Sequence, residues 1–319
     1  IAWAGYVRIG GVDQWIQIRG EDRRNPVILV LHGGPGGTMI PRSYEDDRNW
    51  ERDFTVVHWD QRGGGRTWLR GEDPAITPTI DLITTDGIEV TEFVRRRLGA
   101  PKVVLVGHSW GTILGLEMAR RRPDLFYAYV GTGQVVNMRA NETVGYARLV
   151  ERVRAEGATA DLARLEALGP PPYADLNTLG VERGILMRHP PRGERDLQVR
   201  TLRAMFRAPG YGLSDIWRLS TKQPDPRLWR EVMAYDAAER GLTFRIPVFI
   251  VQGAEDIQTP TELVHPFFEA LVAPTKEMVT VPDVGHMLAL VRGDVLLGEI
   301  KRLVLPVVRR EIRVGVVSG

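Results

Sequence analysis

A serine with glycine two residues before it and two residues after it links a predicted buried strand to a predicted helix. The pentapeptide G-H-S-W-G occupies 107–111, an apolar run over 103–106 precedes it, and a helical pattern over 112–121 follows it. In so tight a turn, side chains at the two glycine positions would collide with neighbouring backbone. The serine is then held in a strained conformation that exposes its hydroxyl. The pattern therefore predicts an α/β sheet protein with Ser109 as a nucleophile.

Strand runs alternate with helical patterns near both ends of the chain and give way to helical patterns in the middle. Between 134 and 240 the sequence has helical stretches and proline-rich breaks without a strong strand. We expect one α/β core formed by 1–133 and 241–319, interrupted by a helical cap domain at 134–240. Strands are predicted over 6–9, 15–19, 26–31, 55–59, 102–106, 128–132, 247–253 and 277–281, and helices over 79–98, 112–121, 261–271 and 294–303.

The composition argues against several classes of function. No cysteine occurs among the 319 residues, which excludes disulfides, thiol catalysis and cysteine-based metal sites. No apolar run approaches the ~20 residues that a membrane helix needs. The 42 basic and 40 acidic residues are mixed along the chain, so neither nucleic acid nor a membrane is an expected partner. No metal or organic cofactor is implied. The chain begins with Ile1, which fits a processed or trimmed start, and we expect a cytoplasmic protein.

A nucleophilic serine requires a histidine base that a carboxylate orients. The expected chain order is serine, acid and histidine, with the acid and the histidine in loops that follow strands. His286 follows a predicted strand and a turn, whereas His265 lies inside a predicted helix. Asp256 and its neighbour Glu255 compete for the acid, and the shorter Asp256 stands further into its loop. We expect Asp256 and His286 to complete a triad with Ser109.

Backbone N–H groups must stabilise the negative charge that develops on the substrate oxygen. One donor is expected from Trp110, the residue after the nucleophile. The second is expected from Gly34 in the glycine-rich loop 32–37, because glycine lets the backbone approach a substrate closely. The same loop lacks the G-x-x-x-x-G-K-[ST] pattern of phosphate binding, so a nucleotide site is not expected.

Five stretches of the chain carry a recognisable pattern, namely H-G-G-P-G-G at 32–37, D-Q-R-G-G-G-R-T at 60–67, G-H-S-W-G at 107–111, G-A-E-D-x-x-T-P at 253–260 and G-H at 285–286. These motifs together resemble the proline iminopeptidase (prolyl aminopeptidase) branch of the α/β-hydrolase superfamily. The resemblance covers about 1–133 and 241–310. It implies an α/β-hydrolase fold with an eight-stranded, mostly parallel sheet, a helical cap after the sixth strand, and the same triad. It further implies that Asp60 and Arg62 support the oxyanion loop.

The cap departs from this family. Prolyl aminopeptidases use cap glutamates to bind the free N-terminal amine, often within W-x-x-W-E and E-N-H-Y-F-like stretches, and neither stretch occurs here. Four cap carboxylates match no motif and are expected to be solvated, namely Glu142, Glu182, Glu194 and Glu231. Some of the cap aromatic residues are expected to line an apolar cleft over Ser109, from the set Tyr146, Tyr173, Phe206, Tyr211, Trp217 and Trp229.

The sequence favours a serine hydrolase that cleaves a small ester or amide through an acyl-enzyme. Its expected partner is a small-molecule or short-peptide substrate, and its oligomeric state stays open. A prolyl aminopeptidase is the alternative, and a lactone or carbon–carbon bond hydrolase is a further one. A non-catalytic ligand-binding protein of the same fold is a fourth interpretation. Epoxide hydrolases and haloalkane dehalogenases are disfavoured, because their nucleophile in this turn is aspartate.

Overall fold

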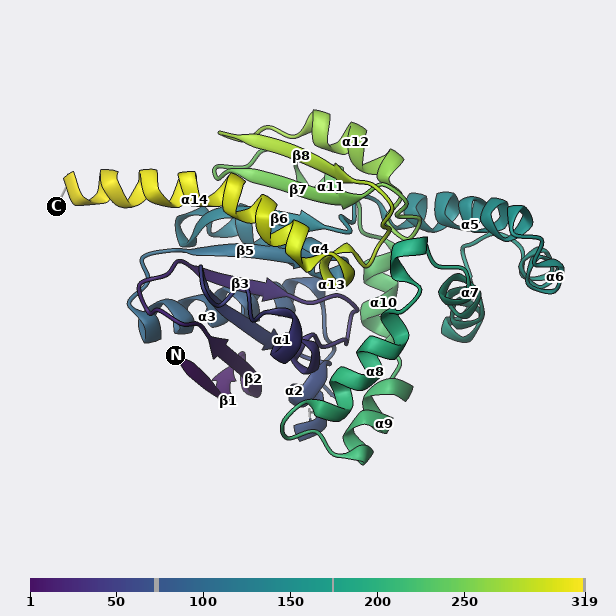
Figure 1. Cartoon of the computed structure of the whole chain (residues 1–319), viewed down its shortest axis with the longest axis horizontal. Helices are drawn as coiled ribbons and strands as arrows, with labels where there is room; N and C mark the ends of the chain where they lie inside the picture. Colours follow the sequence, from purple (N-terminus) through teal and green to yellow (C-terminus); the bar gives the residue numbers. More distant parts are fainter. Residues whose placement is uncertain (72–74, 174, 318–319) are drawn as a thin grey trace.

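An eight-stranded sheet forms the centre of the protein. The computed structural model describes residues 1–71, 75–173 and 175–317, with side chains to residue 313. The strand order is β1-β2-β4-β3-β5-β6-β7-β8 (Figure 1). β2 runs antiparallel to both β1 and β4, and the other neighbours run parallel, which confirms the predicted sheet. The strands are β1 (Ala2–Ile9), β2 (Val12–Arg19), β3 (Val27–Leu31), β4 (Thr55–Asp60), β5 (Val103–His108), β6 (Phe126–Thr132), β7 (Val248–Gly253) and β8 (Lys276–Val281).

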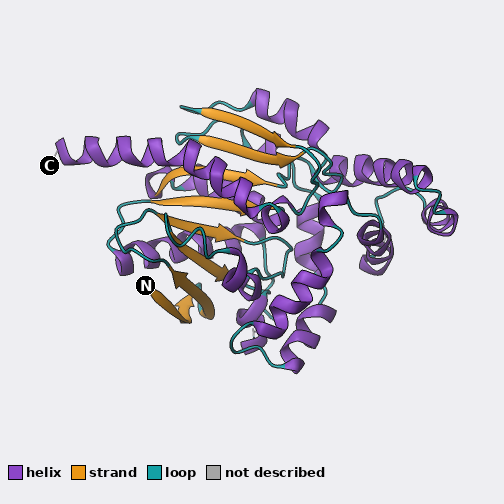
Figure 2. Cartoon of the chain, viewed as in Figure 1, coloured by secondary structure: helices purple, strands orange, loops and turns teal. Residues whose placement is uncertain are grey.

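Helices cover both faces of the sheet, as Figure 2 shows. Alternate residues of β3 supply the two faces: Leu29 belongs to one hydrophobic cluster, with residues of α3 (Ile80–Leu98) and α4 (Trp110–Arg121). Ile28 belongs to the other, with residues of α14 (Gly293–Val317). Because β3 is buried on both faces, its sequence is a continuous run of apolar residues. The shorter core elements are α1 (Ile40–Asp46), α2 (Gly65–Arg70), η1 (Pro123–Leu125), α11 (Ala237–Arg240), α12 (Thr261–Ala270) and α13 (Leu288–Val291).

A helical segment is inserted between β6 and β7 and lies beside the edge where the parallel strands end (Figure 1). Its ends meet, because the Asn137 side-chain amide donates a hydrogen bond of 2.6 Å to Asp236. Part of it has a hydrophobic cluster of its own, made of Leu149, Val153, Leu165, Ile185 and Leu186. That this segment is a separate cap domain stays a prediction. Its described helices are α5 (Met138–Ala155), α6 (Thr159–Leu168), α7 (Leu176–Arg188), η2 (Arg192–Glu194), α8 (Leu197–Arg207), α9 (Leu213–Thr221) and α10 (Pro226–Met233).

None of the helices in the described ranges combines the length and the apolar character that crossing a membrane requires.

The two-sided burial of β3 predicts a large loss of stability when one of its side chains is truncated. Leu29→Ala should lower the free energy of unfolding by about 2–5 kcal/mol, because Leu29 is fully buried. Leu213→Ala is the matched control: Leu213 is 72% exposed, and the change should stay within about 0.5 kcal/mol. Urea unfolding followed by circular dichroism measures both values. Equal losses in the two variants would contradict the assigned core.

Candidate active site

The turn between β5 and α4 holds Ser109 in an unusual backbone conformation. Its φ of 53° and ψ of −123° lie in a region that residues other than glycine rarely adopt. A Cβ added at Gly107 would lie 2.7 Å from the carbonyl oxygen of Gly111, and one added at Gly111 would lie 2.0 Å from that of Leu31. Only glycine fits at either position. The turn is further held by a hydrogen bond of 3.0 Å from the Ser109 N–H to the Thr132 carbonyl.

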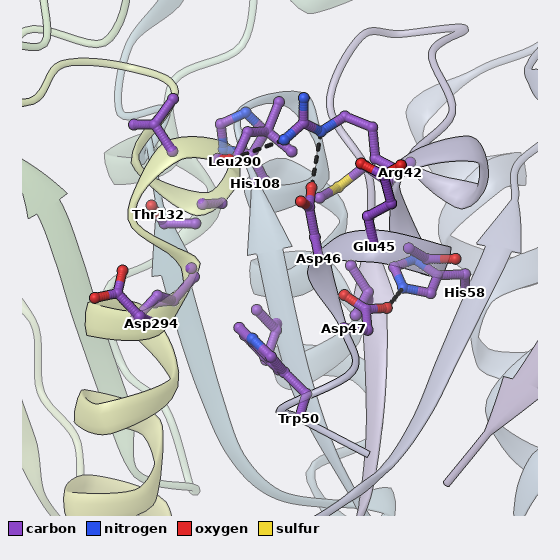
Figure 3. A pocket seen from close by; sticks show the side chains of 18 of the residues that line it. Arg42, Glu45, Asp46, Asp47, Trp50, His58, His108, Thr132, Leu290 and Asp294 are labelled. Atoms are coloured by element: carbon purple, nitrogen blue, oxygen red, sulfur yellow. Dashed lines mark hydrogen bonds and ion pairs between the residues drawn. The ribbon is translucent and has the colours of Figure 1, made fainter. Parts of the chain in front are cut away.

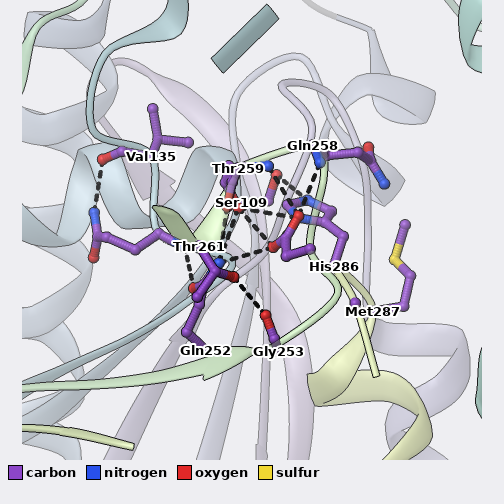
Figure 4. A network of polar contacts seen from close by, with 12 residues as sticks. Ser109, Val135, Gln252, Gly253, Gln258, Thr259, Thr261, His286 and Met287 are labelled. Atoms are coloured by element: carbon purple, nitrogen blue, oxygen red, sulfur yellow. Dashed lines mark hydrogen bonds and ion pairs between the residues drawn. The ribbon is translucent and has the colours of Figure 1, made fainter. Parts of the chain in front are cut away.

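The structure brings Ser109, Asp256 and His286 together from the ends of three strands. Figure 4 shows Ser109 and His286 within this network of polar contacts. His286 Nε2 lies 2.9 Å from Ser109 Oγ. His286 Nδ1 lies 2.9 Å from Asp256 Oδ2. The two competing residues lie elsewhere: Glu255 is half-buried, with Arg152 3.9 Å away, and His265 is exposed on α12. The serine, the imidazole and the carboxylate thus form one hydrogen-bonded chain.

Asp256 is held in place by donors that the sequence patterns did not identify. Its Oδ1 accepts 2.9 Å hydrogen bonds from the backbone N–H groups of Gln258 and Thr259. Its Oδ2 accepts from the Thr259 hydroxyl at 2.7 Å and from Gln252 Nε2 at 3.0 Å. Burial alone would raise the pKa of Asp256, but His286 and the Thr259 hydrogen bonds outweigh burial and lower that pKa. Asp256 is therefore ionised at neutral pH.

Two further histidines beside the site are buried and uncharged. Burial lowers the pKa of His108 to about 3 and the pKa of His32 to about 4. The His108 ring centroid lies 5.1 Å from that of His286. Because His108 is neutral at physiological pH, it places no second positive charge beside an imidazolium that forms at His286.

A cavity of about 80 Å³ brings the predicted oxyanion donors to the triad: Gly34 and Trp110 line it together with Ser109 and His286. Trp110 is the first residue of α4, so its backbone N–H has no acceptor within the helix. Gly34 is required by its own loop, since its φ is 141° and an added Cβ would lie 2.7 Å from the Gly36 nitrogen. The predicted donors therefore line one cavity.

Gln61 joins the two halves of this oxyanion region, although sequence analysis gave it no role. Its Oε1 accepts a hydrogen bond of 2.8 Å from the Trp110 indole. Its backbone N–H donates to His32 Nε2 at 3.2 Å, at the start of the glycine-rich loop. It stands between Asp60 and Arg62 in the D-Q-R-G-G-G-R-T stretch, which was the only available sign of its importance.

Asp60 and Arg62 lie in different surroundings. Asp60 is fully buried and accepts hydrogen bonds from the Thr38 hydroxyl at 2.6 Å and the Arg66 N–H at 2.8 Å, so it contacts the end of the glycine-rich loop. That Arg62 supports the oxyanion loop stays a prediction. Its guanidinium pairs with Asp86 at 2.9 Å and donates to the Gly10 carbonyl, and it therefore links α3 to the first hairpin.

The inserted helices close the cavity with charged residues, against the expectation that their carboxylates are solvated. Glu142, Arg183 and Trp229 line it. Arg183 pairs with Glu142 at 2.5 Å and with Glu182 at 3.0 Å. Although burial acts to lower the pKa of Arg183, the two carboxylates raise it, so the guanidinium stays charged. Glu142 and Glu182 are buried because they share this cation. Glu194 is buried too, for a different reason described below.

Glu142 has one oxygen outside this ion pair. Its Oε2 is buried and accepts no hydrogen bond from the described part of the protein. Glu142 and Trp229 line both this small cavity and a larger one of about 650 Å³. Of the cap aromatic residues, Trp229 thus lies by the triad, whereas Phe206 and Trp217 are largely exposed.

Another cavity, of about 260 Å³, is lined by residues of α1, β4 and α13 (Figure 3). His108 lines it, next to Ser109 in the chain. Arg42 pairs with Asp46 at 2.8 Å, and His58 Nε2 lies 2.5 Å from Asp47. None of the three predicted triad residues lines this cavity, whereas Ser109 and His286 line the smaller one.

Comparisons with known proteins identify the family and the fold. The model of the alpha/beta hydrolase fold family matches residues 26–167. A probable aminopeptidase (YbaC) of Bacillus subtilis is 30% identical over 286 residues, covering 87% of this chain and 88% of that protein. A probable proline iminopeptidase of Streptomyces coelicolor is 26% identical and covers 84% of each chain. The structure of proline iminopeptidase from Mycobacterium smegmatis has a similar fold, with a TM-score of 0.69, 21% identity and 96% and 98% coverage of the two chains.

The burial of Asp60 predicts a measurable pH dependence of stability. Burial raises its pKa from the usual 3.8 to about 6, so the folded state binds this proton more tightly than the unfolded state. The stabilising contribution of Asp60 is therefore present below pH 4 and is lost as the pH rises through 6. Relative to Asp60→Asn, the wild type should lose about 2 kcal/mol of unfolding free energy between pH 4 and pH 7. Urea unfolding at the two pH values measures this difference, and Asp294→Asn, at an exposed position, is the control. If the unfolding free energies of wild type and Asp60→Asn changed in parallel with pH, the prediction would be contradicted.

Proposed function

Because the chain belongs to the α/β-hydrolase family, among its proline iminopeptidase-like members, and is a hydrolase, we propose that it cleaves a small amide or ester through an acyl-enzyme on Ser109. The observation that carries this proposal is the hydrogen-bonded chain from Ser109 Oγ through His286 to Asp256, with 2.9 Å at each step. These three hydrogen-bonded side chains would supply a nucleophile, a base and an orienting acid.

In the acylation step, Ser109 Oγ attacks the substrate carbonyl carbon while its proton moves to His286 Nε2. Asp256 stays ionised and stabilises the imidazolium that forms. The carbonyl oxygen becomes an oxyanion, which the backbone N–H groups of Gly34 and Trp110 stabilise. When the tetrahedral intermediate collapses, the bond to the leaving amine or alcohol breaks, and His286 returns the proton to that group.

Deacylation repeats the same steps with water. His286 removes a proton from water as its oxygen attacks the acyl carbon, and a second oxyanion forms at the same donors. Collapse of this intermediate breaks the ester bond to Ser109 Oγ, which takes the proton back from His286. The product is a free carboxylic acid and the enzyme is restored.

A second function, aminopeptidase activity, is favoured by Glu142. A carboxylate at the cavity, with one buried oxygen unpaired by the described protein, suits a substrate ammonium group. Two carboxylates share the single cation Arg183, which leaves one negative charge for a substrate amine to balance. The names of the relatives, probable aminopeptidase and probable proline iminopeptidase, point the same way. We therefore propose an N-terminal proline amide as one substrate to test.

Ser109→Ala should abolish turnover of every substrate, because no other nucleophile is proposed. The assay uses proline p-nitroanilide, its N-acetyl form and a short-chain p-nitrophenyl ester. A loss of at least about 10³-fold in kcat is expected. A fluorophosphonate probe should label the wild type and the exposed-serine control Ser214→Ala, but not Ser109→Ala. Turnover that survives in Ser109→Ala would refute the mechanism, and a wild type that is neither labelled nor active would indicate a ligand-binding protein.

Glu142→Gln tests the aminopeptidase function. It keeps the size of the side chain and removes its charge, so KM for free proline p-nitroanilide should rise about 10–100-fold, because a charged hydrogen bond to the substrate is lost. Hydrolysis of the p-nitrophenyl ester should change little. The matched control is Glu166→Gln, an exposed glutamate of the same inserted segment. Equal changes for amine and ester substrates would contradict amine recognition by Glu142.

A further inference from the structure

Glu194 connects the inserted helices to the loop that carries His286. It ends the short helical turn η2 between α7 and α8. Its Oε1 accepts hydrogen bonds from the backbone N–H groups of Gly285, at 2.8 Å, and Met287, at 3.0 Å. These are the residues immediately before and after His286, and Figure 4 shows Met287 beside the histidine. One carboxylate oxygen therefore accepts hydrogen bonds from the residues on both sides of His286.

The same two segments are packed so closely that glycine is needed on each side. A Cβ added at Gly193 would lie 2.7 Å from the Asp283 carbonyl oxygen. A Cβ added at Gly285 would lie 2.9 Å from Cγ of Pro191. The turn at 191–194 and the loop at 283–287 are thus in close contact, and the Glu194 hydrogen bonds lie within this contact.

We propose that Glu194 is a positioning residue, which acts through His286 and makes the geometry of the triad depend on the docking of the inserted helices. This inference rests on the proposed function. The imidazole must direct Nε2 to Ser109 and Nδ1 to Asp256 at once, and a small rotation of its loop would break one of these bonds. Two hydrogen bonds to one buried acceptor resist that rotation, because either N–H would otherwise lose its partner.

The electrostatic surroundings of Glu194 fit this role. Burial raises its pKa, while the two N–H donors and the nearby His286 act in the opposite direction. Buried carboxylates are retained where donors satisfy them, and here the donors are those of the catalytic loop. The group touches no predicted reacting atom, so it would act on catalysis through His286.

The test compares Glu194→Gln with Glu194→Met. The amide oxygen of Gln can still accept both hydrogen bonds, whereas Met fills the space without an acceptor. Per active site titrated with the fluorophosphonate probe, Glu194→Met should lower kcat about 10–100-fold with little change in KM, as expected when a reacting group is misplaced. Glu194→Gln should stay within about threefold of the wild type.

The matched control is Glu231→Met. Glu231 is another carboxylate of the inserted segment that bonds a core backbone group, the Ile80 N–H at 2.9 Å, at the start of α3. Its loss should change stability without changing kcat per site. Gly193→Ala offers a second route to the same outcome, because its new methyl group meets the Asp283 carbonyl and forces the two segments apart.

A readout without substrate separates this inference from the proposed function. The downfield NMR resonance of the His286 Nδ1–H proton reports its hydrogen bond to Asp256 in the resting protein. It should be unchanged in Glu194→Gln and Glu231→Met, and shifted or lost in Glu194→Met and Gly193→Ala. An unchanged resonance together with unchanged kcat in Glu194→Met would overturn the positioning role. A wild type without Ser109-dependent turnover, but with the expected shift in Glu194→Met, would refute the hydrolytic mechanism while supporting the positioning role.

Discussion

The contact between the Leu31 carbonyl and Gly111 is the constraint on which the site depends. Since an added Cβ at Gly111 would lie 2.0 Å from that oxygen, α4 rests directly on the end of β3. The glycine-rich loop with Gly34 begins at the same end of β3, and Ser109 immediately precedes α4. The nucleophile and one predicted oxyanion donor are therefore spaced by backbone contact, which varies less than contacts between flexible side chains.

The remaining groups reach the serine because parallel strands end at one edge of the sheet. β7 and β8 are paired from Val248–Lys276 to Gly253–Val281, so their following loops, with Asp256 and His286, start side by side. Asp256 accepts hydrogen bonds from Thr259 in its own loop and from Gln252 at the end of β7. A carboxylate so restrained can present one oxygen to the imidazole in one direction, which is what an orienting acid requires.

The core was predictable from sequence because its signals are local. The buried runs of the sheet are read along single strands, and the G-x-S-x-G turn is contained in five residues. Even there, helix ends were less certain: the last helix, predicted over 294–303, extends to Val317 and contains Pro306. A proline is read as a helix stop because it lacks an N–H donor, yet packing of α14 on the sheet keeps the helix intact.

The inserted segment was predicted as helical, which the structure confirms. The expectation that its carboxylates are solvated was wrong for Glu142, Glu182 and Glu194, which are buried. Glu142 on α5 is 41 residues from Arg183 on α7, and nothing near either residue indicates that they pair. Likewise, Glu194 is 91 residues from Gly285, whose backbone N–H donates a hydrogen bond to it. Burial of a charge is decided by such distant partners, so a single carboxylate in a helical stretch is read as solvated.

The two kinds of buried carboxylate in the insert have different consequences for the site. Glu194 has its donors supplied by the catalytic loop, so its hydrogen bonds strengthen the folded arrangement whether or not a substrate is present. Glu142 lines the cavity, and one of its carboxylate oxygens is buried and accepts no hydrogen bond from the described protein. A buried acceptor left in that state costs about 1–3 kcal/mol of stability, and a ligand that donates to it recovers this free energy on binding. In the mechanism that we propose, the core thus supplies the reacting groups, while the insert orients one of them and carries the charge that selects the substrate.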